Sequence, residues 1–277
     1  MASYDDGYGA QPRMQLSLPP LTMWVKRLMI ANAAIFIGLF LVGFAPEIQV
    51  QIIDILGLNP GMWRNGIPAV WQFFTYAFLH DAQGLGHILY NMLGLFFFGT
   101  MLESMLGARR FIVFYGSAAL AGALLHLVFM LLIGRDSTTI GASGAVMGVI
   151  VAAATLRPHD QVLFIFIPVK LWVLAAILVA VDIFPLLQEL QSGGGDRIAH
   201  TVHLGGALFG FLAVKRRWIW SDPIAAIQKK RAVADAERRL SEDARMDQLL
   251  AKIGRDGLGS LSKSEKAFLN KRSARKK

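Results

Sequence analysis

Residues 141–148 read Gly-Ala-Ser-Gly-Ala-Val-Met-Gly, and this stretch decides how the chain is interpreted. Ser143 stands directly before a short apolar segment, residues 144–156. Polar side chains are costly inside a membrane helix, so one that stands at the start of such a helix is a functional candidate. The small residues around it leave the first backbone N–H groups accessible to a developing oxyanion. The stretch therefore predicts a serine at a helix N-terminus, beside an anion-binding position.

A second stretch matches the first one. His203 is followed by Gly206 and Gly210, three and seven residues later, and the three positions share one helix face. Gly144 and Gly148 form a similar stripe after the serine, and such stripes let two helix backbones approach closely. The serine and the histidine could then reach the roughly 2.6–3.2 Å at which a base activates a hydroxyl. A single stripe is more often only a packing motif, but two stripes that each begin beside a polar residue favour a site.

The composition indicates a membrane protein that crosses the bilayer several times. Hydrophobic residues make up 55% of the chain and charged residues only 17%. Six apolar segments approach the roughly 20 residues that cross about 30 Å of hydrocarbon, and they are residues 28–45, 85–102, 111–133, 144–156, 171–187 and 198–214. We therefore predict an all-α membrane protein with six transmembrane helices. Cysteine is absent, which excludes disulfides and thiol catalysis.

Charge predicts the orientation and the organisation of the chain. The positive-inside rule makes the side with the basic helix ends cytoplasmic, together with both termini; those ends carry Lys26, Arg27, Arg109, Arg110, Arg157, Lys170 and residues 215–217. The first 22 residues contain no apolar signal-peptide region, so we expect the first helix to stay as an anchor. We divide the chain into a flexible N-terminal segment, a six-helix domain and a basic cytoplasmic tail, at residues 1–22, 23–217 and 218–277.

Two segments outside the six helices also have a readable pattern. Residues 47–80 are too polar to span a membrane, and their apolar spacing predicts a helix that lies in the membrane interface. After Trp220 the chain holds fifteen Lys and Arg against eight Asp and Glu. Ser262 and Glu265 there form a capping-box pattern, which favours a helical hairpin. Basic residues beside a membrane favour anionic lipid as a partner over nucleic acid.

Sequence distance also predicts depth, because a helix rises about 1.5 Å per residue. Measured from the charged residues at the basic ends of their helices, Ser143 lies about 21 Å into the membrane, and His203 and Asn91 lie about 18 Å in. His87 lies one turn above Asn91. Four polar side chains on three helices therefore fall into one layer, roughly 10 Å below the opposite face of the hydrocarbon.

Three ordered motifs make the chain resemble the rhomboid intramembrane serine proteases. They are the Gly-Ala-Ser-Gly of residues 141–144, the glycine-rich run of residues 202–210, and the His-Ile-Leu-Tyr-Asn of residues 87–91. The resemblance covers roughly residues 26–217, and the tail is similar to a short C-terminal cytoplasmic appendage of some bacterial members. It implies a six-helix rhomboid bundle with a partly embedded first loop, in a bacterial cytoplasmic membrane.

The resemblance also implies a reaction. Ser143 corresponds to the nucleophile and His203 to the general base of a Ser-His dyad, while His87 and Asn91 correspond to the pair that stabilises the oxyanion. The expected activity is endopeptidase cleavage of transmembrane or membrane-proximal segments of other membrane proteins. The expected partners are these substrates and the lipid bilayer. The resemblance implies no metal and no cofactor, and it leaves the oligomeric state open.

Several residues leave alternatives open. Gln72 stands where many members have arginine, which puts the fixing of the first loop in question, and Met147 replaces a common aromatic residue that packs on the catalytic histidine. Asp182 lies near the polar layer and would suit a Ser-His-Asp triad, but the resemblance favours an aspartate that faces the cavity or caps a broken helix. His200 is a second candidate base. A pseudoprotease that binds membrane clients and a small transporter are the rival functions.

Overall fold

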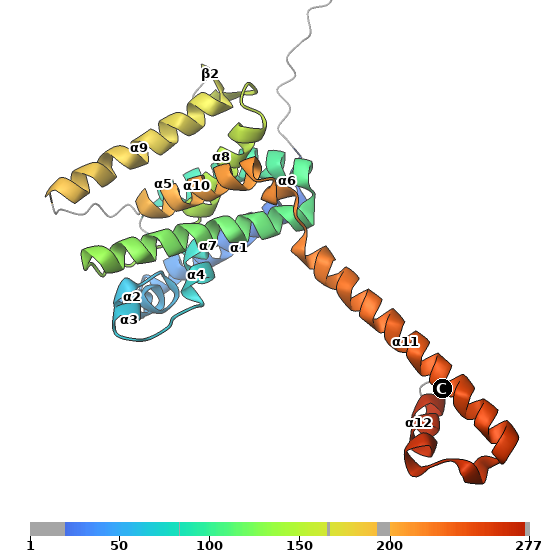
Figure 1. Ribbon diagram of the computed structural model, residues 1–277. Helices are drawn as coiled ribbons and strands as arrows, with labels where there is room; N and C mark the ends of the chain where they lie inside the picture. The colour runs from blue at the N-terminus through green and yellow to red at the C-terminus, as the bar shows by residue number, and fades with distance from the viewer. Residues whose placement is uncertain (1–19, 83, 165–166, 193–199, 275–277) are drawn as a thin grey trace, which may run out of the picture. The chain divides into compact units, whose positions relative to one another are not determined.

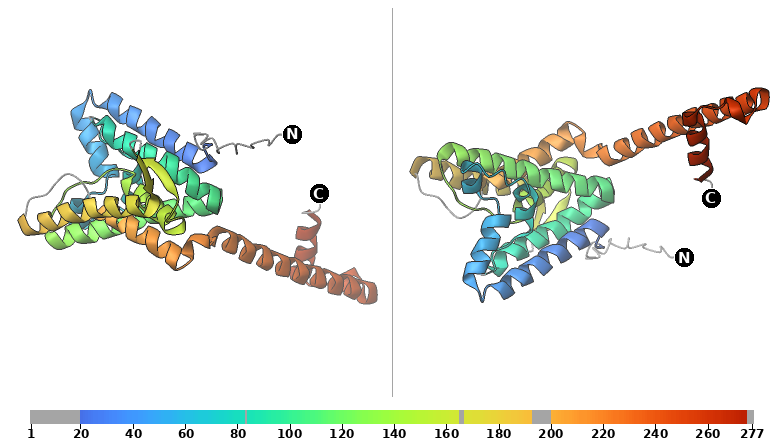
Figure 2. Two further views of the ribbon diagram at one scale, coloured as in Figure 1. Left: turned by 90° about the horizontal axis from the view of Figure 1, so that it is seen from above. Right: turned by 90° about the horizontal axis from the view of Figure 1, so that it is seen from below.

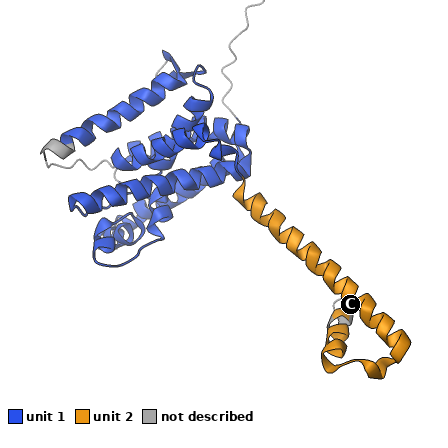
Figure 3. Ribbon diagram, in the orientation of Figure 1, with its two compact units in different colours: residues 1–221 blue, residues 222–277 orange. Residues whose placement is uncertain are grey.

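The computed structural model describes residues 20–82, 84–164, 167–192 and 200–274. Most of the expected flexible segment at residues 1–22 therefore lies outside the described residues. The chain divides into two units, residues 1–221 and 222–277, a few residues beyond the boundary expected at residue 217 (Figure 3).

All six apolar segments form helices, which confirms the predicted all-α membrane fold (Figure 1). The second segment is one helix in three parts, α5, a π-helical stretch η2 and α6. The helices are α1 (Met23–Val42), α5 (Leu85–Gly94), η2 (Leu95–Gly99), α6 (Thr100–Leu106), α7 (Ala108–Ile133), α8 (Ser143–Leu156), α9 (Leu171–Ser192) and α10 (His200–Lys215).

The helices differ in length, and the shortest two carry the candidate serine and histidine. Among the described residues, four helical stretches are long and apolar enough to cross a membrane, namely α1, α5 to α6, α7 and α9. The described part of α8 has 14 residues and that of α10 has 16. At about 1.5 Å per residue these two measure roughly 21–24 Å, less than the ~30 Å of hydrocarbon. The N-terminus of α8 is therefore expected to begin below the membrane surface.

Helix α8 forms the centre of the bundle. Every residue of Gly144–Ala154 is buried, whereas α1 and α9 expose large apolar side chains such as Phe40 and Phe184. Figure 2 shows α1 beside the α5–α6 helix at one edge of the bundle, and α9 packs on α10 and α8. Apolar side chains on the outer helices suit contact with lipid.

The contact between α8 and α10 consists of backbone against backbone. A Cβ atom added to Gly206 would lie 1.9 Å from the carbonyl oxygen of Gly144, and one added to Gly210 would lie 2.3 Å from that of Gly148. Real Cβ atoms essentially never approach below 3.0 Å. The two small-residue stripes predicted from the sequence therefore do face each other, and no side chain larger than hydrogen fits between them.

The first loop contains four short helical elements, as the expected embedded loop would. They are α2 (Pro46–Leu56), α3 (Pro60–Arg64), α4 (Gln72–Thr75) and η1 (Tyr76–Phe78). The loop is joined to α7 by an ion pair of 2.6 Å between Arg64 and Asp136, which lies just beyond that helix. Leu58 and Thr139 exchange two backbone hydrogen bonds of 2.9 Å, so the loop also pairs with the segment that enters α8.

Gln72 organises this loop in place of the arginine that many rhomboids carry. The side chain is fully buried, and its Oε1 accepts from the backbone N–H of Asn59 at 3.1 Å and from the indole N–H of Trp63 at 3.2 Å. Its amide nitrogen donates to the carbonyl oxygens of Asp54 at 3.3 Å and Ile55 at 3.1 Å. One neutral amide therefore connects α2, α3 and α4 from the inside.

A β-hairpin and a helical tail complete the fold. An antiparallel hairpin of β1 (Gln161–Phe164) and β2 (Ile167–Lys170) connects α8 to α9, and the sequence did not predict it. The tail forms the predicted helical hairpin, in which the Glu265 side chain accepts from the backbone N–H of Ser262 at 2.6 Å and the Ser262 hydroxyl from the backbone N–H of Glu265 at 3.2 Å. The remaining elements are η3 (Trp218–Trp220), α11 (Pro223–Asp256), η4 (Leu258–Ser260) and α12 (Lys263–Ala274).

Candidate active site

Ser143 is the first residue of α8, and the segment before it is tightly held. Gly141 has φ +131°, a backbone conformation that residues other than glycine rarely adopt. Its N–H donates to the Tyr76 carbonyl at 2.9 Å. The Tyr76 hydroxyl in turn donates to the Ala119 carbonyl of α7 at 2.8 Å. Since the first N–H groups of a helix lack intrahelical partners, Ser143 sits where an anion would be bound.

His203 lies in contact with this serine. Its Nε2 is 2.7 Å from the Ser143 Oγ, a distance at which a base can take the hydroxyl proton. The two residues lie 60 positions apart, and the close approach of α8 and α10 at Gly206 and Gly210 brings them together. His200 makes no such contact with the serine, so the geometry favours His203 over His200 as the base.

Asp182 is the residue that the sequence placed wrongly. Helix α9 continues through Pro185, so Asp182 caps no broken helix, and it is buried instead of facing a cavity. Its Oδ1 accepts from His203 Nδ1 at 2.9 Å and from His200 Nδ1 at 2.8 Å. The structure thus brings together a serine, a histidine and an aspartate in the order of a triad, which the sequence had left as the less favoured alternative.

His87 approaches the serine from α5. A Cβ atom built on Gly141 would lie 2.7 Å from the His87 Nε2 and 3.5 Å from the Ser143 Oγ, so both groups border the same small space. Asn91, one turn further along α5, directs its amide nitrogen to the His87 carbonyl at 2.9 Å and to His80 Nε2 at 3.2 Å. His87 therefore borders the space beside the Ser143 hydroxyl, and Asn91 bonds to the helix turn that carries His87.

His80 lies at the end of the first loop, and its Nε2 is 3.2 Å from the amide nitrogen of Asn91 on α5. The ring is fully buried and lies 5.0 Å from the His87 ring, centroid to centroid. Burial, followed by the neighbouring His87, lowers the pKa of His80 to about 4. His80 is therefore neutral at physiological pH, as it must be if its Nε2 is to accept from the Asn91 amide.

His126, by contrast, is a packing residue that is fully buried. Its two ring nitrogens lie 2.6 Å from the Thr201 hydroxyl and 2.8 Å from the Thr139 hydroxyl. The ring therefore connects α7 to α10 and to the segment before Ser143. Met147 is buried one turn after the serine.

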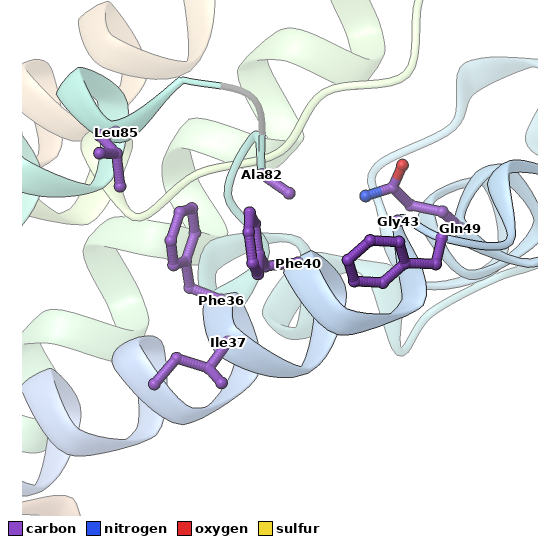
Figure 4. Close-up of a pocket in the computed structure, with 8 residues that line it drawn as sticks. Phe36, Ile37, Phe40, Gly43, Gln49, Ala82 and Leu85 are labelled. Atoms are coloured by element: carbon purple, nitrogen blue, oxygen red, sulfur yellow. The ribbon is translucent and has the colours of Figure 1, made fainter.

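Two other features have the form of binding sites, a cluster of three titratable side chains and an apolar pocket. Asp182, His200 and His203 offer ligand atoms within 4.8 Å of one another and could hold a divalent metal ion. A pocket of about 620 Å³ opens at the end of α1, where Phe36, Phe40 and Leu85 are among its lining residues (Figure 4). Its lining includes neither Ser143 nor His203, and it is predominantly apolar, so it offers no chemistry of its own.

Comparison with known proteins decides the family. A model of the rhomboid domain matches residues 68–218, which is more than half of the chain. The chain belongs to the rhomboid family. The matched region contains Ser143, His203, His87 and Asn91, and also Asp182.

Several relatives of this rhomboid are known by name. Rhomboid protein 1, mitochondrial, from Saccharomyces cerevisiae is 32% identical over 184 residues, which cover 58% of this chain and 51% of that protein. Presenilin-associated rhomboid-like protein, mitochondrial, from Mus musculus is 28% identical over 200 residues, covering 72% and 50%. RHOMBOID-like protein 12, mitochondrial, from Arabidopsis thaliana is 31% identical over 157 residues, covering 51% and 45%. This rhomboid spans about half the length of the relatives it matches.

These relatives correct the expected location. The resemblance to bacterial members had implied a bacterial cytoplasmic membrane, and the positive-inside rule had placed both termini in the cytoplasm, but the relatives are mitochondrial proteins by name. That expectation is wrong. The hydropathy and charge patterns of this rhomboid could not reveal the error, because they report that a membrane is crossed and not which membrane it is.

Proposed function

We propose that this rhomboid is an intramembrane serine endopeptidase that cleaves transmembrane or membrane-proximal segments of other membrane proteins. The observation that carries the proposal is the 2.7 Å approach of His203 Nε2 to Ser143 Oγ at the N-terminus of α8. A serine and a base at this distance form the minimal unit of nucleophilic catalysis. Family membership supports the same reaction class, and the relatives' names favour a mitochondrial membrane.

The proposed reaction has two steps. The Ser143 Oγ attacks the substrate carbonyl carbon while its proton moves to His203 Nε2, and the carbonyl oxygen becomes an oxyanion. The N–H groups at the start of α8 and the His87 ring stabilise that charge, with Asn91 in support. His203 then gives the proton to the departing amine, and a water activated by the same ring hydrolyses the acyl-enzyme.

The organisation of the chain follows from this proposal. We take residues 23–217 as the catalytic domain, residues 1–22 as a segment that precedes it and residues 218–277 as an appendage that does not take part in the chemistry. The partners would be the lipid bilayer and membrane-protein substrates, and nucleic acid is not among them. Two rival functions, a binding protein without proteolysis and a small transporter, predict no reactive serine.

A fluorophosphonate probe tests the proposal on the purified full-length chain in detergent. We expect covalent labelling at Ser143, located by mass spectrometry, and complete loss of labelling in Ser143→Ala. His203→Ala should reduce the labelling rate by a factor on the order of 10³ or more, because the serine loses its base. Absence of labelling in the wild-type chain, or labelling that persists in Ser143→Ala, would contradict the proposal.

A further inference from the structure

We infer that Asp182, held in turn by His200, is a positioning residue for His203, so that the site operates as a Ser-His-Asp arrangement and not as a dyad. The inference depends on the proposed function and adds a residue to it. It starts from one atom: Oδ1 of Asp182 accepts from His203 Nδ1 at 2.9 Å and from His200 Nδ1 at 2.8 Å.

The shared oxygen determines which nitrogen of His203 carries the proton. An ionised carboxylate can only accept hydrogen bonds, so each Nδ1 that points at it must be an N–H. In a neutral imidazole the other nitrogen is then a bare acceptor. For His203 that nitrogen is Nε2, which lies 2.7 Å from the Ser143 Oγ. Asp182 therefore holds His203 in the one neutral tautomer that can receive the serine proton.

Burial makes this arrangement effective. The side chains of Asp182 and His200 are 7% and 5% exposed, and that of His203 is 18% exposed. Hydrogen bonds to a charged acceptor in such surroundings are stronger than the same bonds in water. When Ser143 gives up its proton, His203 becomes a cation beside the carboxylate. The negative charge then stabilises the state that forms only during the reaction.

His200 completes the arrangement from the neighbouring turn of α10. Its Nδ1 donates to Asp182, while its Nε2 has no hydrogen-bond partner among the described residues. Within the described part of the chain, the one hydrogen bond of the His200 ring is thus with the aspartate. A second N–H donor fixes the carboxylate oxygen between the two rings, so that Asp182, which comes from α9, stays aligned with His203. His200 acts on the aspartate and does not touch the serine.

The same three residues could instead bind a metal ion, since their ligand atoms lie within 4.8 Å of one another. A metal would occupy the Nδ1 lone pairs of both histidines, and neither could then be an N–H donor. Metal binding by the two Nδ1 atoms and hydrogen bonding from them to Asp182 therefore exclude each other. The hydrogen-bond lengths of 2.8 and 2.9 Å match charge-assisted N–H···O contacts, which favours the proton over the metal.

The experiment measures fluorophosphonate labelling of the full chain as a function of probe concentration, which separates the maximal rate from the half-saturating concentration. Asp182→Asn should lower the maximal rate on the order of 100-fold or more and leave the half-saturating concentration within about threefold. Asp182→Glu, which restores the charge, should have a maximal labelling rate at least about tenfold higher than that of Asp182→Asn. His200→Leu should lower the rate about tenfold, and His200→Gln, which keeps an N–H donor, should recover most of it.

A matched control and a spectrum separate positioning from folding. Glu103 is a second buried carboxylate, which accepts from the backbone N–H groups of Trp24 and Val25 at the start of α1. Glu103→Gln should reduce the thermal unfolding temperature without changing the labelling rate of the folded protein. The wild-type proton NMR spectrum should show a strongly downfield imidazole N–H that is lost in both Asp182→Asn and His203→Ala.

Three results would overturn the inference while leaving the proposed function intact. The first is Asp182→Asn labelling within about threefold of the wild-type rate at Ser143. The second is a rate loss in Asp182→Asn that Glu103→Gln reproduces in proportion to its loss of stability. The third is loss of wild-type labelling on treatment with EDTA, restored by zinc. Absence of any wild-type labelling at Ser143 would instead count against the proposed function itself.

Discussion

The α8–α10 contact and the first loop both position the candidate active site, but they do so by opposite means. Between α8 and α10 the deciding feature is the absence of side chains at Gly206 and Gly210, where only backbone atoms fit. In the first loop the deciding feature is one side chain, the buried amide of Gln72, which satisfies backbone groups from several turns. The first region should therefore be broken by adding a methyl group, and the second by removing an amide.

The largest effect is expected where a methyl group has no space. Gly206→Ala would place a Cβ atom 1.9 Å from the Gly144 carbonyl oxygen, so the two helices must separate. Overpacking of this kind costs about 1–3 kcal/mol or more, and a displacement of the histidine by about 1 Å costs about 100-fold in rate. We expect fluorophosphonate labelling to fall at least that far.

The control for this substitution is Gly116→Ala in α7, where a Cβ atom would meet nothing within 4 Å. That variant should keep the wild-type labelling rate, and its thermal unfolding temperature should stay the same or rise slightly, since alanine is a better helix former. If Gly206→Ala and Gly116→Ala have the same labelling rate and the same unfolding temperature, the α8–α10 contact leaves room for a methyl group and the prediction is wrong.

A smaller effect is expected from Gln72→Ala. The change removes the acceptor of the half-buried indole N–H of Trp63 and of the backbone N–H of Asn59, and it leaves a cavity in place of the buried Gln72 side chain. Unsatisfied buried polar groups cost about 1–3 kcal/mol each, so we expect a loss of about 2–4 kcal/mol in stability. Hydrogen exchange should accelerate in residues 46–64, whereas the exposed Gln51→Ala should change neither measurement.

The smallest effect concerns His80, which joins the end of the first loop to Asn91 of α5. The folded protein keeps His80 neutral down to about pH 4, whereas the unfolded chain protonates it near pH 6.5. A histidine whose pKa is lowered by folding costs stability as the pH falls through this window. Between pH 7.5 and pH 5 the loss should be about 2 kcal/mol.

The measurement compares thermal unfolding of the wild-type chain and of His80→Gln at both pH values. Glutamine cannot titrate but can still accept from the Asn91 amide, so the variant should lose less stability on acidification. If both proteins respond to acid to the same extent, the pH dependence arises elsewhere and His80 is not held neutral in the folded state.

Sequence alone predicted the features that depend on periodicity. Helix α7 and the pairing of the Gly206 stripe with the Gly144 stripe follow from spacing, and the contact between Ser143 and His203 follows from two residues at equal depth on facing stripes. Each of these predictions starts from the spacing of residues along one helix, which the local sequence encodes. The resemblance to rhomboids then supplied the roles, and the site assignment stays a prediction until the serine is shown to react.

The sequence could not place Asp182, because depth does not give the rotation of a helix. A residue in the right layer can face a neighbouring helix, a cavity or lipid, and only the packing of α9 on α10 selects among these. Gln72 was read as a deviation from the family, although four hydrogen-bonding positions of a neutral amide can satisfy several buried backbone groups at once.

The segment from Thr139 to Ser143 has a consequence for how this chain could change length during evolution. It is fixed at Thr139 by Leu58, at Gly141 by the Tyr76 carbonyl, and at Ser143 by the start of α8. An inserted residue could not be absorbed there, since it would shift the serine out of register with His203. The hairpin between α8 and α9, whose described residues lie outside the candidate site, is where length variation among homologues should accumulate.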